Sequence, residues 1–241
     1  MRGERHVYPS LEEVSRKLAT ALADIVKGVV RESGKCAFAF SGGGTPELLY
    51  HILGSDYRET IPWEKVHFYW GDDRFVPHDA EESNFRLVKT TILDEVDVPD
   101  EHVHPFHTLA DSPEEAAREY EVEMMETLEG DPPVLDIALM GLGNDGHTAS
   151  LFPGSQALEV GDRLVVPTTA PDPPRQRLTM TYPVFNAAYH VIFLVAGRRK
   201  AEVVKEVLTG DVSKERYPAV GIDPVQGMPE WWMDEAAASL L

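Results

Sequence analysis

Short apolar runs separated by amphipathic segments dominate the chain. The run KCAFAFS (35–41) is almost wholly apolar, as is typical of a strand covered on both faces. Further apolar runs at 66–72, 134–141 and 189–197, a run near 163–168 and an alternating segment at 177–182 also predict strands. Strands that alternate with helices indicate right-handed crossovers. We therefore expect an α/β fold, a mostly parallel sheet with helices on both faces in a Rossmann-like three-layer sandwich.

The helices between these strands have recognisable starts and spacings. Ser10 and Glu13 form a capping box, and apolar residues then recur at helical spacing through Leu18, Leu22 and Val29. We expect this helix to be the only element in the first 34 residues. The other expected helices cover 46–53, 83–93, 113–129, a short segment from Pro183, 199–208, and a terminal helix within 232–241. No repeat or composition break divides the chain, so we expect one domain over 1–241.

The composition narrows the class of protein. Forty-one acidic residues oppose 22 basic ones, for a formal net charge of −19, which disfavours nucleic acid and anionic membranes as partners. The single cysteine, Cys36, excludes an internal disulfide framework and suits a buried apolar position better than a nucleophile. No apolar run reaches the roughly 18 residues of a membrane span, and MRGERHVYPSLEE lacks the apolar middle of a signal peptide. We expect a cytoplasmic protein, as a monomer or weak homodimer.

The segment SGGGTP (41–46) joins a predicted buried strand to a predicted helix. Its glycines permit a sharp turn with outward-facing N–H groups, and a helix N-terminus favours anions. The Lys-Ser/Thr pair of a P-loop is absent. This segment predicts a phosphate cradle, to which Lys200 and one of Arg175 or Arg177 add positive charge.

The segment LDIALMGLGNDGHTASLFPG (135–154) contains a G-x-G-x-x-G pattern at Gly141, Gly143 and Gly146. A dinucleotide-binding turn opens a long helix and is followed about 20 residues later by an acid that ends the next strand. Here Pro153 comes seven residues after Gly146, and the acids Glu159 and Asp162 precede the next strand. The glycines are better explained as a tight turn that presents Asp145 and His147.

Three further residues with useful chemistry follow the strand at 66–72. GDDRFVP (71–77) places Asp72, Asp73 and Arg74 at its end, and an arginine fork suits a carboxylate or an anionic ligand. In an open parallel sheet, ligands bind beyond the carboxyl ends of the strands, where the cradle, GDDR and the glycine turn should meet. An imidazole group suits the role of general base, so His147 is the candidate base.

Taken together, SGGGTPELLY, WGDDRFVP followed by ESN (82–84), MGLGNDGHTASLFPG, RLTMTYPVFNAA and WWMDEAAA resemble, in order and spacing, the 6-phosphogluconolactonase family. The resemblance spans nearly the whole chain, and GHTASLFPG is its most specific part. It implies the fold shared with glucosamine-6-phosphate deaminase and ribose-5-phosphate isomerase, with no metal or cofactor. The implied reaction is hydrolysis of 6-phospho-D-glucono-1,5-lactone, the second step of the oxidative pentose phosphate pathway.

The resemblance also implies roles for individual residues. His147 would activate water, Asp145 would accompany it, and Arg74 would face the lactone, with Asp72 in register. The family usually has Glu where this chain has Asp73, which leaves the role of Asp73 open. The implied phosphate ligands are Gly42, Gly43, Gly44, Thr45, Lys200 and Arg175, with Arg177, Arg198 and Arg199 as alternatives to Arg175.

Three other functions remain as alternatives. A glucosamine-6-phosphate deaminase would have Asn-Glu-Pro where this chain has Leu151-Phe152-Pro153, and Asp-Glu-Tyr at the second strand. A sugar-phosphate sensor domain would carry a basic helix-turn-helix segment. A nicotinamide enzyme would need the dinucleotide-binding turn that the sequence argues against. A δ-lactone requires only a positioned base, an oxyanion donor and a handle on the substrate, so no nucleophilic serine is expected.

Overall fold

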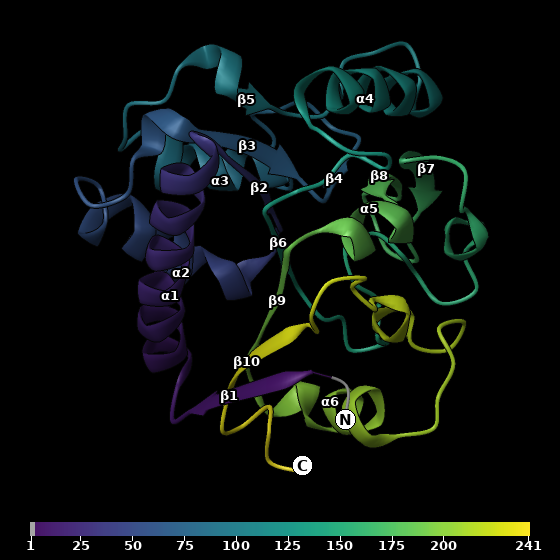
Figure 1. Cartoon of the computed structure of the whole chain (residues 1–241). Coiled ribbons are helices and arrows are strands. Elements are labelled where there is room, and N and C mark those ends of the chain that lie inside the picture. Colours follow the sequence, from purple (N-terminus) through teal and green to yellow (C-terminus); the bar gives the residue numbers. More distant parts are fainter. Residues whose placement is uncertain (1–2) are drawn as a thin grey trace.

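A seven-stranded, all-parallel sheet forms the centre of the computed structural model, which describes residues 3–241 (Figure 1). Every pair of neighbouring strands in this sheet runs parallel, which confirms the predicted fold class. The strand order is β1-β10-β9-β6-β2-β3-β5. The bounds are β1 Glu4–Tyr8, β2 Cys36–Phe40, β3 Val66–Trp70, β5 Val103–His104, β6 Ile137–Met140, β9 His190–Val195 and β10 Glu230–Asp234.

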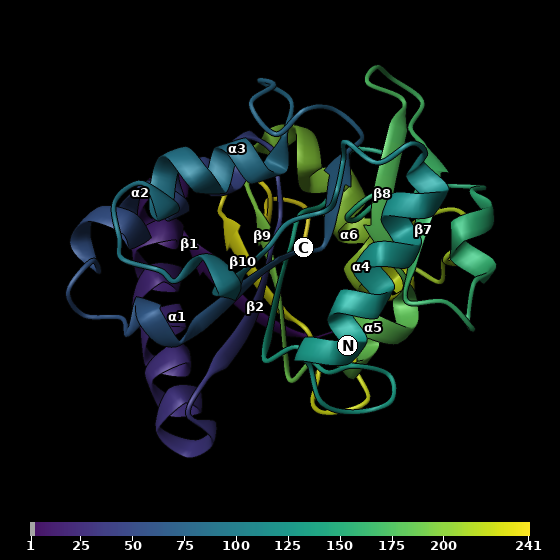
Figure 2. The ribbon, with the colours of Figure 1, turned by 90° about the horizontal axis from the view of Figure 1, so that it is seen from above.

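Helices cover both faces of this sheet. Figures 1 and 2 show α1, α2 and α3 on one side and α4, α5 and α6 on the other. The helix α1 begins after the N-cap Ser10, whose side chain accepts a hydrogen bond from the backbone of Glu13, so the predicted capping box marks its start. The bounds are α1 Leu11–Ser33, α2 Gly44–Asp56, α3 Asn84–Val88, α4 Pro113–Thr127, α5 Tyr182–Ala187 and α6 Ala201–Thr209.

A second, antiparallel sheet of three strands lies beside the large one. Its order is β4 (Asp72–Arg74), β8 (Gln176–Met180) and β7 (Val165–Thr169). Only Gly71 separates the end of β3 from the start of β4, and the chain leaves the parallel sheet at this residue. Strands 163–168 and 177–182 were predicted, but their pairing with β4 was not. This sheet forms one wall of the functional site.

Two predicted elements are wrong. The strand β1 precedes α1, so the first 34 residues are not a single helix; residues 1–2 lie outside the part described. The predicted terminal helix is instead the strand β10 followed by turns. β10 lies between β1 and β9, and Trp231 stacks on Phe193 with ring centroids 4.0 Å apart. Pairing with distant strands decides the conformation here, and a local pattern cannot report it.

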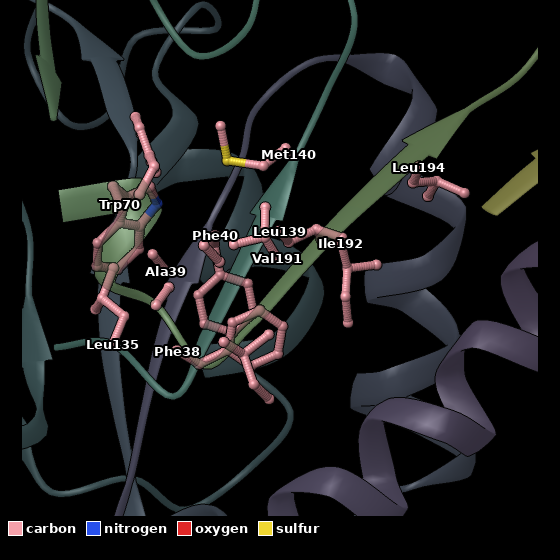
Figure 3. Close-up of a cluster of buried hydrophobic side chains, with 14 of the residues drawn as sticks. Phe38, Ala39, Phe40, Trp70, Leu135, Leu139, Met140, Val191, Ile192 and Leu194 are labelled. Carbon is pink, nitrogen blue, oxygen red and sulfur yellow. The ribbon is translucent and has the colours of Figure 1, made fainter. Parts of the chain in front are cut away.

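Aromatic and aliphatic side chains fill the core at the centre of the sheet. Figure 3 shows Phe38 and Phe40 of β2 beside Leu139 of β6 and Ile192 of β9. These four side chains are at most 1% exposed, and Phe40 stacks on Phe68 with ring centroids 4.9 Å apart. A close-packed interior of this kind resists deformation. The loops that follow these strands therefore start from rigid positions.

Candidate active site

A cleft of about 600 Å³ lies beyond the carboxyl ends of the parallel strands. Residues that follow β2, β6 and β9 line it together with residues of the antiparallel strands β4 and β8. Almost all residues proposed from the sequence line this cleft, although they come from distant parts of the chain. They are Gly42, Gly43, Gly44, Thr45, Asp72, Arg74, Asp145, His147 and Lys200.

The turn after β6 holds a histidine against a carboxylate. The Nδ1 atom of His147 donates a hydrogen bond of 2.6 Å to Oδ1 of Asp145. This bond leaves Nε2 as the unprotonated nitrogen of a neutral imidazole. Burial opposes the ionisation of Asp145, but the hydrogen bond from His147, and the charge of its imidazole when protonated, prevail and hold the pKa of this carboxyl below its usual value. A neutral imidazole with an oriented, free Nε2 can accept a proton from water.

The glycines of this turn leave room for the side chain of the histidine. No helix follows the turn; the chain passes through turns to a short 3₁₀ segment at Gln156–Glu159. A Cβ atom on Gly143 would lie 2.1 Å from Nδ1 of His147 and 2.6 Å from Oδ1 of Asp145. Gly146 has a φ of +82°, which side chains rarely tolerate. The pattern therefore permits the close approach of the histidine and carboxylate, and lacks the helix that a dinucleotide site needs.

The glycine segment that the sequence predicts to cradle a phosphate lies at the start of α2. Gly43 is the N-cap residue, with a φ of +92°, and the helix starts at Gly44 with Thr45 in its first turn. Ser41, which precedes the three glycines, is held by Tyr50. The hydroxyl of Tyr50 accepts a hydrogen bond from the backbone N–H of Ser41 and donates one to the carbonyl of Ser41. Uncapped N–H groups at a helix N-terminus attract anions. This geometry suits a phosphate.

Asp73 is the central residue of β4, and its buried side chain organises the loop beside that strand. Its carboxylate accepts hydrogen bonds from the backbone N–H groups of Arg74, Asn84 and Phe85 and from the hydroxyl of Ser83. Burial raises the pKa of Asp73 to about 6, although these backbone hydrogen bonds act in the opposite direction. Asp73 is 1% exposed and does not line the cleft. It therefore holds its neighbours in place and has no route to substrate.

Asn84, the last residue of ESN (82–84), lines the cleft and was not predicted as a site residue. Its Oδ1 accepts a hydrogen bond of 2.6 Å from Nη1 of Arg74, and its Nδ2 donates one of 2.8 Å to the carbonyl of Asp72. A Cβ atom on Gly42 would lie 1.7 Å from Asn84 Oδ1, so the cradle packs directly on this amide. Asn84 thus connects Arg74, Asp72 and the cradle.

A second residue missed from the sequence is Ser150. Its hydroxyl donates a hydrogen bond of 2.6 Å to Oδ2 of Asp72, and both side chains are buried at the wall of the cleft. Ser150 follows His147 by three residues in GHTAS, so its position in a functional loop was the available signal. Among residues 3–241, its hydroxyl has one side-chain hydrogen-bond partner, the carboxylate of Asp72. It therefore lacks the hydrogen-bonded histidine that activates a nucleophilic serine.

The structure separates the candidate cations. Lys200 lines the cleft and donates a hydrogen bond of 2.6 Å to the carbonyl of Leu142; burial lowers its pKa, although Asp145 acts to raise it. Arg177 also lines the cleft, whereas Arg175 is exposed and lines a neighbouring hollow. The structure therefore does not bring Arg175 to the cradle. Arg198 donates to the Ser239 hydroxyl; neither Arg198 nor Arg199 lines the cleft.

Three global features complete the description. Within residues 3–241, no cluster of three or more histidine, cysteine or acidic side chains is arranged to hold a metal ion. None of the helices described there combines the length and apolar character needed to span a bilayer. Cys36 is buried, and burial raises the pKa of its thiol far above the usual value, as suits an inert core residue.

Comparison with known proteins shows which family the chain resembles. Residues 9–231 match the sequence model described as "Glucosamine-6-phosphate isomerases/6-phosphogluconolactonase". The 6-phosphogluconolactonase of Synechocystis sp. is 41% identical over 231 residues, which cover 95% of this chain and 93% of that protein. The rat protein of the same name is 36% identical over 98% of this chain and 92% of its own length.

Solved structures agree. That of 6-phosphogluconolactonase from Trypanosoma brucei has a TM-score of 0.87 at 28% identity, over 100% of this chain and 99% of its own. A monomeric glucosamine-6-phosphate deaminase has a TM-score of 0.83 at 22% identity, over 99% of this chain and 100% of its own, and at that identity the likeness concerns the fold alone. With a match over residues 9–231 and relatives above 30% identity along almost its whole length, the chain belongs to the glucosamine-6-phosphate isomerase/6-phosphogluconolactonase family.

Proposed function

We propose that the protein is a 6-phosphogluconolactonase, which hydrolyses 6-phospho-D-glucono-1,5-lactone to 6-phosphogluconate as the second step of the oxidative pentose phosphate pathway. One observation carries the proposal: the hydrogen-bonded pair His147–Asp145 and the glycine cradle at the start of α2 line one cleft. A general base and an anion site are the minimum that a phosphorylated lactone needs. The names of the relatives support the same reaction.

In the proposed mechanism, His147 acts as a general base towards water. Its Nε2 takes a proton while the oxygen attacks the lactone carbonyl, and Asp145 stabilises the imidazolium that forms through its 2.6 Å hydrogen bond. Arg74, held by Asn84 at the wall of the cleft, faces the carbonyl oxygen as it becomes an oxyanion. The ring oxygen leaves as a hydroxyl after receiving the proton back from His147. No covalent intermediate is needed.

The phosphate is assigned to the cradle and Lys200. The backbone N–H groups of Gly43, Gly44 and Thr45 lie at the N-terminal end of α2, where the helix dipole favours negative charge. Lys200 is the half-buried lysine of the cleft. Arg175, which the resemblance placed beside the phosphate, lines the neighbouring hollow, so we give it no direct contact in this proposal.

The residues of the cleft favour a lactonase over a deaminase. The segment after His147 is Leu151-Phe152-Pro153, so it offers no carboxylate for opening a sugar ring. Phe152 instead lies against the imidazole, with ring centroids 4.8 Å apart. Arg74 occupies the position where the deaminase pattern has tyrosine. These differences support hydrolysis of a lactone. The acid that a deaminase would use to open the ring of an amino sugar is absent from this segment.

A coupled assay tests the proposal. Glucose-6-phosphate dehydrogenase generates the lactone in place. The disappearance of the lactone is then measured with and without the protein, and spontaneous hydrolysis is subtracted. The lactone should disappear faster with the protein, and glucosamine-6-phosphate should release no ammonia. Unchanged lactone decay would refute the proposal, and ammonia release would favour the deaminase.

We further infer that the chain works as a single sugar-phosphate lactonase domain over 1–241, as a monomer or weak homodimer in the cytoplasm. The family match over 9–231 supports one domain, and the acidic net charge of −19 supports a protein that stays apart from nucleic acid and anionic lipid. Gel filtration across a range of concentrations tests the oligomeric state, and cell fractionation tests the location.

A further inference from the structure

Arg177 is a buried cation whose Nε atom is unsatisfied among residues 3–241. Its side chain is 9% exposed and belongs to β8, where it lines the cleft. Its Nε atom has no hydrogen-bond partner among residues 3–241. Asp72 and Asp73 influence it through space, but within the same residues neither forms an ion pair with it. Buried charges are normally paired and hydrogen-bonded, so the unsatisfied Nε of this guanidinium can receive a ligand.

A second guanidinium faces it. In the antiparallel pairing of β4 with β8, Arg74 stands directly opposite Arg177, and like charges opposite each other destabilise a sheet. Burial and the charge of Arg74 both lower the pKa of Arg177. Arg74 has a side-chain partner at Nη1, in Asn84, but its buried Nε has none among the residues described. The wall therefore holds two guanidinium groups side by side, each with a buried Nε atom that has no hydrogen-bond partner among residues 3–241.

We propose that Arg177 and Arg74 together bind the carboxylate of the aldonate product, at the end of the substrate where the lactone carbonyl reacts. This inference rests on the proposed function and assigns the substrate end that the antiparallel sheet recognises. Planar guanidinium forks match the two oxygens of a carboxylate. Before the ring opens, the same pair faces the carbonyl oxygen as it gains charge.

The surroundings of the pair favour a carboxylate over the phosphate. Asp72 lies in the same wall, 7% exposed, with Oδ2 accepting from Ser150. The charge of Asp72 would repel a dianionic phosphate, but the remaining lone pairs of its carboxylate can accept a hydrogen bond from a hydroxyl group. An aldonate carries a hydroxyl on the carbon next to its carboxylate, so Asp72 and the arginine pair fit adjacent groups of one ligand. The cradle and Lys200 remain available for the phosphate.

The test compares two ligands that differ at one end. 6-Phosphogluconate and D-glucitol 6-phosphate share the phosphate and the chain hydroxyls, and only the first has a carboxylate. Calorimetric titration is carried out on the wild type, on Arg177→Gln and on Arg199→Gln. The last removes the same charge at an exposed position outside the cleft, so it controls for long-range electrostatics.

The wild type should bind 6-phosphogluconate at least about tenfold more tightly than glucitol 6-phosphate, since hydrogen bonds to charged groups are individually strong. Arg177→Gln should abolish this preference while changing the affinity for glucitol 6-phosphate less than about threefold. Arg199→Gln should retain the preference. Arg177→Lys, which keeps the charge without the fork, should lose most of the preference.

Two results would overturn the inference. An equal loss for both ligands in Arg177→Gln would make Arg177 a phosphate ligand, and an unchanged preference would remove it from recognition. Thermal unfolding checks the fold, and Arg177→Gln should melt no lower than the wild type because it removes a buried charge whose Nε atom is unsatisfied among residues 3–241. The binding measurements do not depend on the catalytic activity of the protein. A wild type that speeds lactone hydrolysis without preferring the carboxylate refutes only this inference, and one that does not speed it refutes the proposed function.

Discussion

Replacing Gly143 with alanine should disable the histidine while leaving the fold in place. The added methyl carbon would lie 2.1 Å from Nδ1 of His147, 2.3 Å from its Cε1 and 2.6 Å from Oδ1 of Asp145. Ordinary van der Waals contact starts at 3.4 Å. The imidazole must therefore move by about 1.3 Å, which breaks its 2.6 Å hydrogen bond to Asp145. A misplacement of about 1 Å can lower a catalysed rate about a hundredfold.

The expected result for Gly143→Ala is a fall in kcat of about a hundredfold. Gly143 does not have a positive φ, so the cost to stability is steric only, about 1–3 kcal/mol for overpacking. For a chain of this size, each kcal/mol lowers Tm by about 2–4 °C. Initial rates come from the coupled lactone assay, and Tm from circular dichroism.

The matched control is Gly141→Ala, in the same glycine pattern. Gly141 also lacks a positive φ, and an added methyl carbon meets no protein atom within 4 Å. A dinucleotide turn would need both glycines, whereas the structure predicts that only Gly143 is sensitive. If Gly143→Ala keeps its rate within about threefold of the wild type, or if Gly141→Ala falls as far, then the steric explanation of the pattern is wrong.

Three further predictions concern the base, the phosphate handle and the buried carboxylate. His147→Ala should lower kcat by about a hundredfold to ten-thousandfold, and the wild-type rate should fall on the acid side as the imidazole is protonated; a residual rate within about threefold of the wild type would remove His147 as the base. Lys200→Ala should mainly raise KM for the phosphorylated lactone and change KM little for glucono-1,5-lactone; equal effects on both would place Lys200 away from the phosphate. The pKa of Asp73 is raised from 3.8 to about 6, so the folded state binds this proton more tightly, and the contribution of Asp73 to the free energy of unfolding should decrease as pH rises from about 4 to about 6. Urea unfolding of the wild type and of Asp73→Asn across that range measures the difference, and identical slopes would contradict the raised pKa.

The strands that carry the site could be predicted because their environment is uniform. β2, β6 and β9 are covered on both faces, so they appear in the sequence as continuous apolar runs. The residues that follow such strands meet at one edge of a parallel sheet. This rule brought the cradle, Asp145, His147 and Lys200 together from the sequence, and the structure places all of them in one cleft.

The errors have a common cause in non-local pairing. β1 and β10 pair with each other across more than 200 residues, and EWWMD (230–234) next to an alanine-rich end is equally compatible with a helix. β1 contains residues that are only half-buried, so it gives a weak apolar signal. The propensity of such short segments is decided by the strands beside them.

The sequence by itself determined the central strands β2, β3, β6 and β9, the helices between them, the glycine turn at the start of α2 and the turn that presents His147. Each of these depends on residues close together in the chain. Only the tertiary structure decided the roles within GDDR and among the arginines. Pairing of β4 with β8 makes Asp72–Arg74 a strand, and since successive side chains in a strand point to opposite faces, Asp72 and Arg74 reach the cleft while Asp73 is buried. The same pairing sets Arg177 opposite Arg74, whereas Arg175 precedes β8 and stays exposed. About 100 residues separate these partners in the chain, so only the folded sheet brings them together.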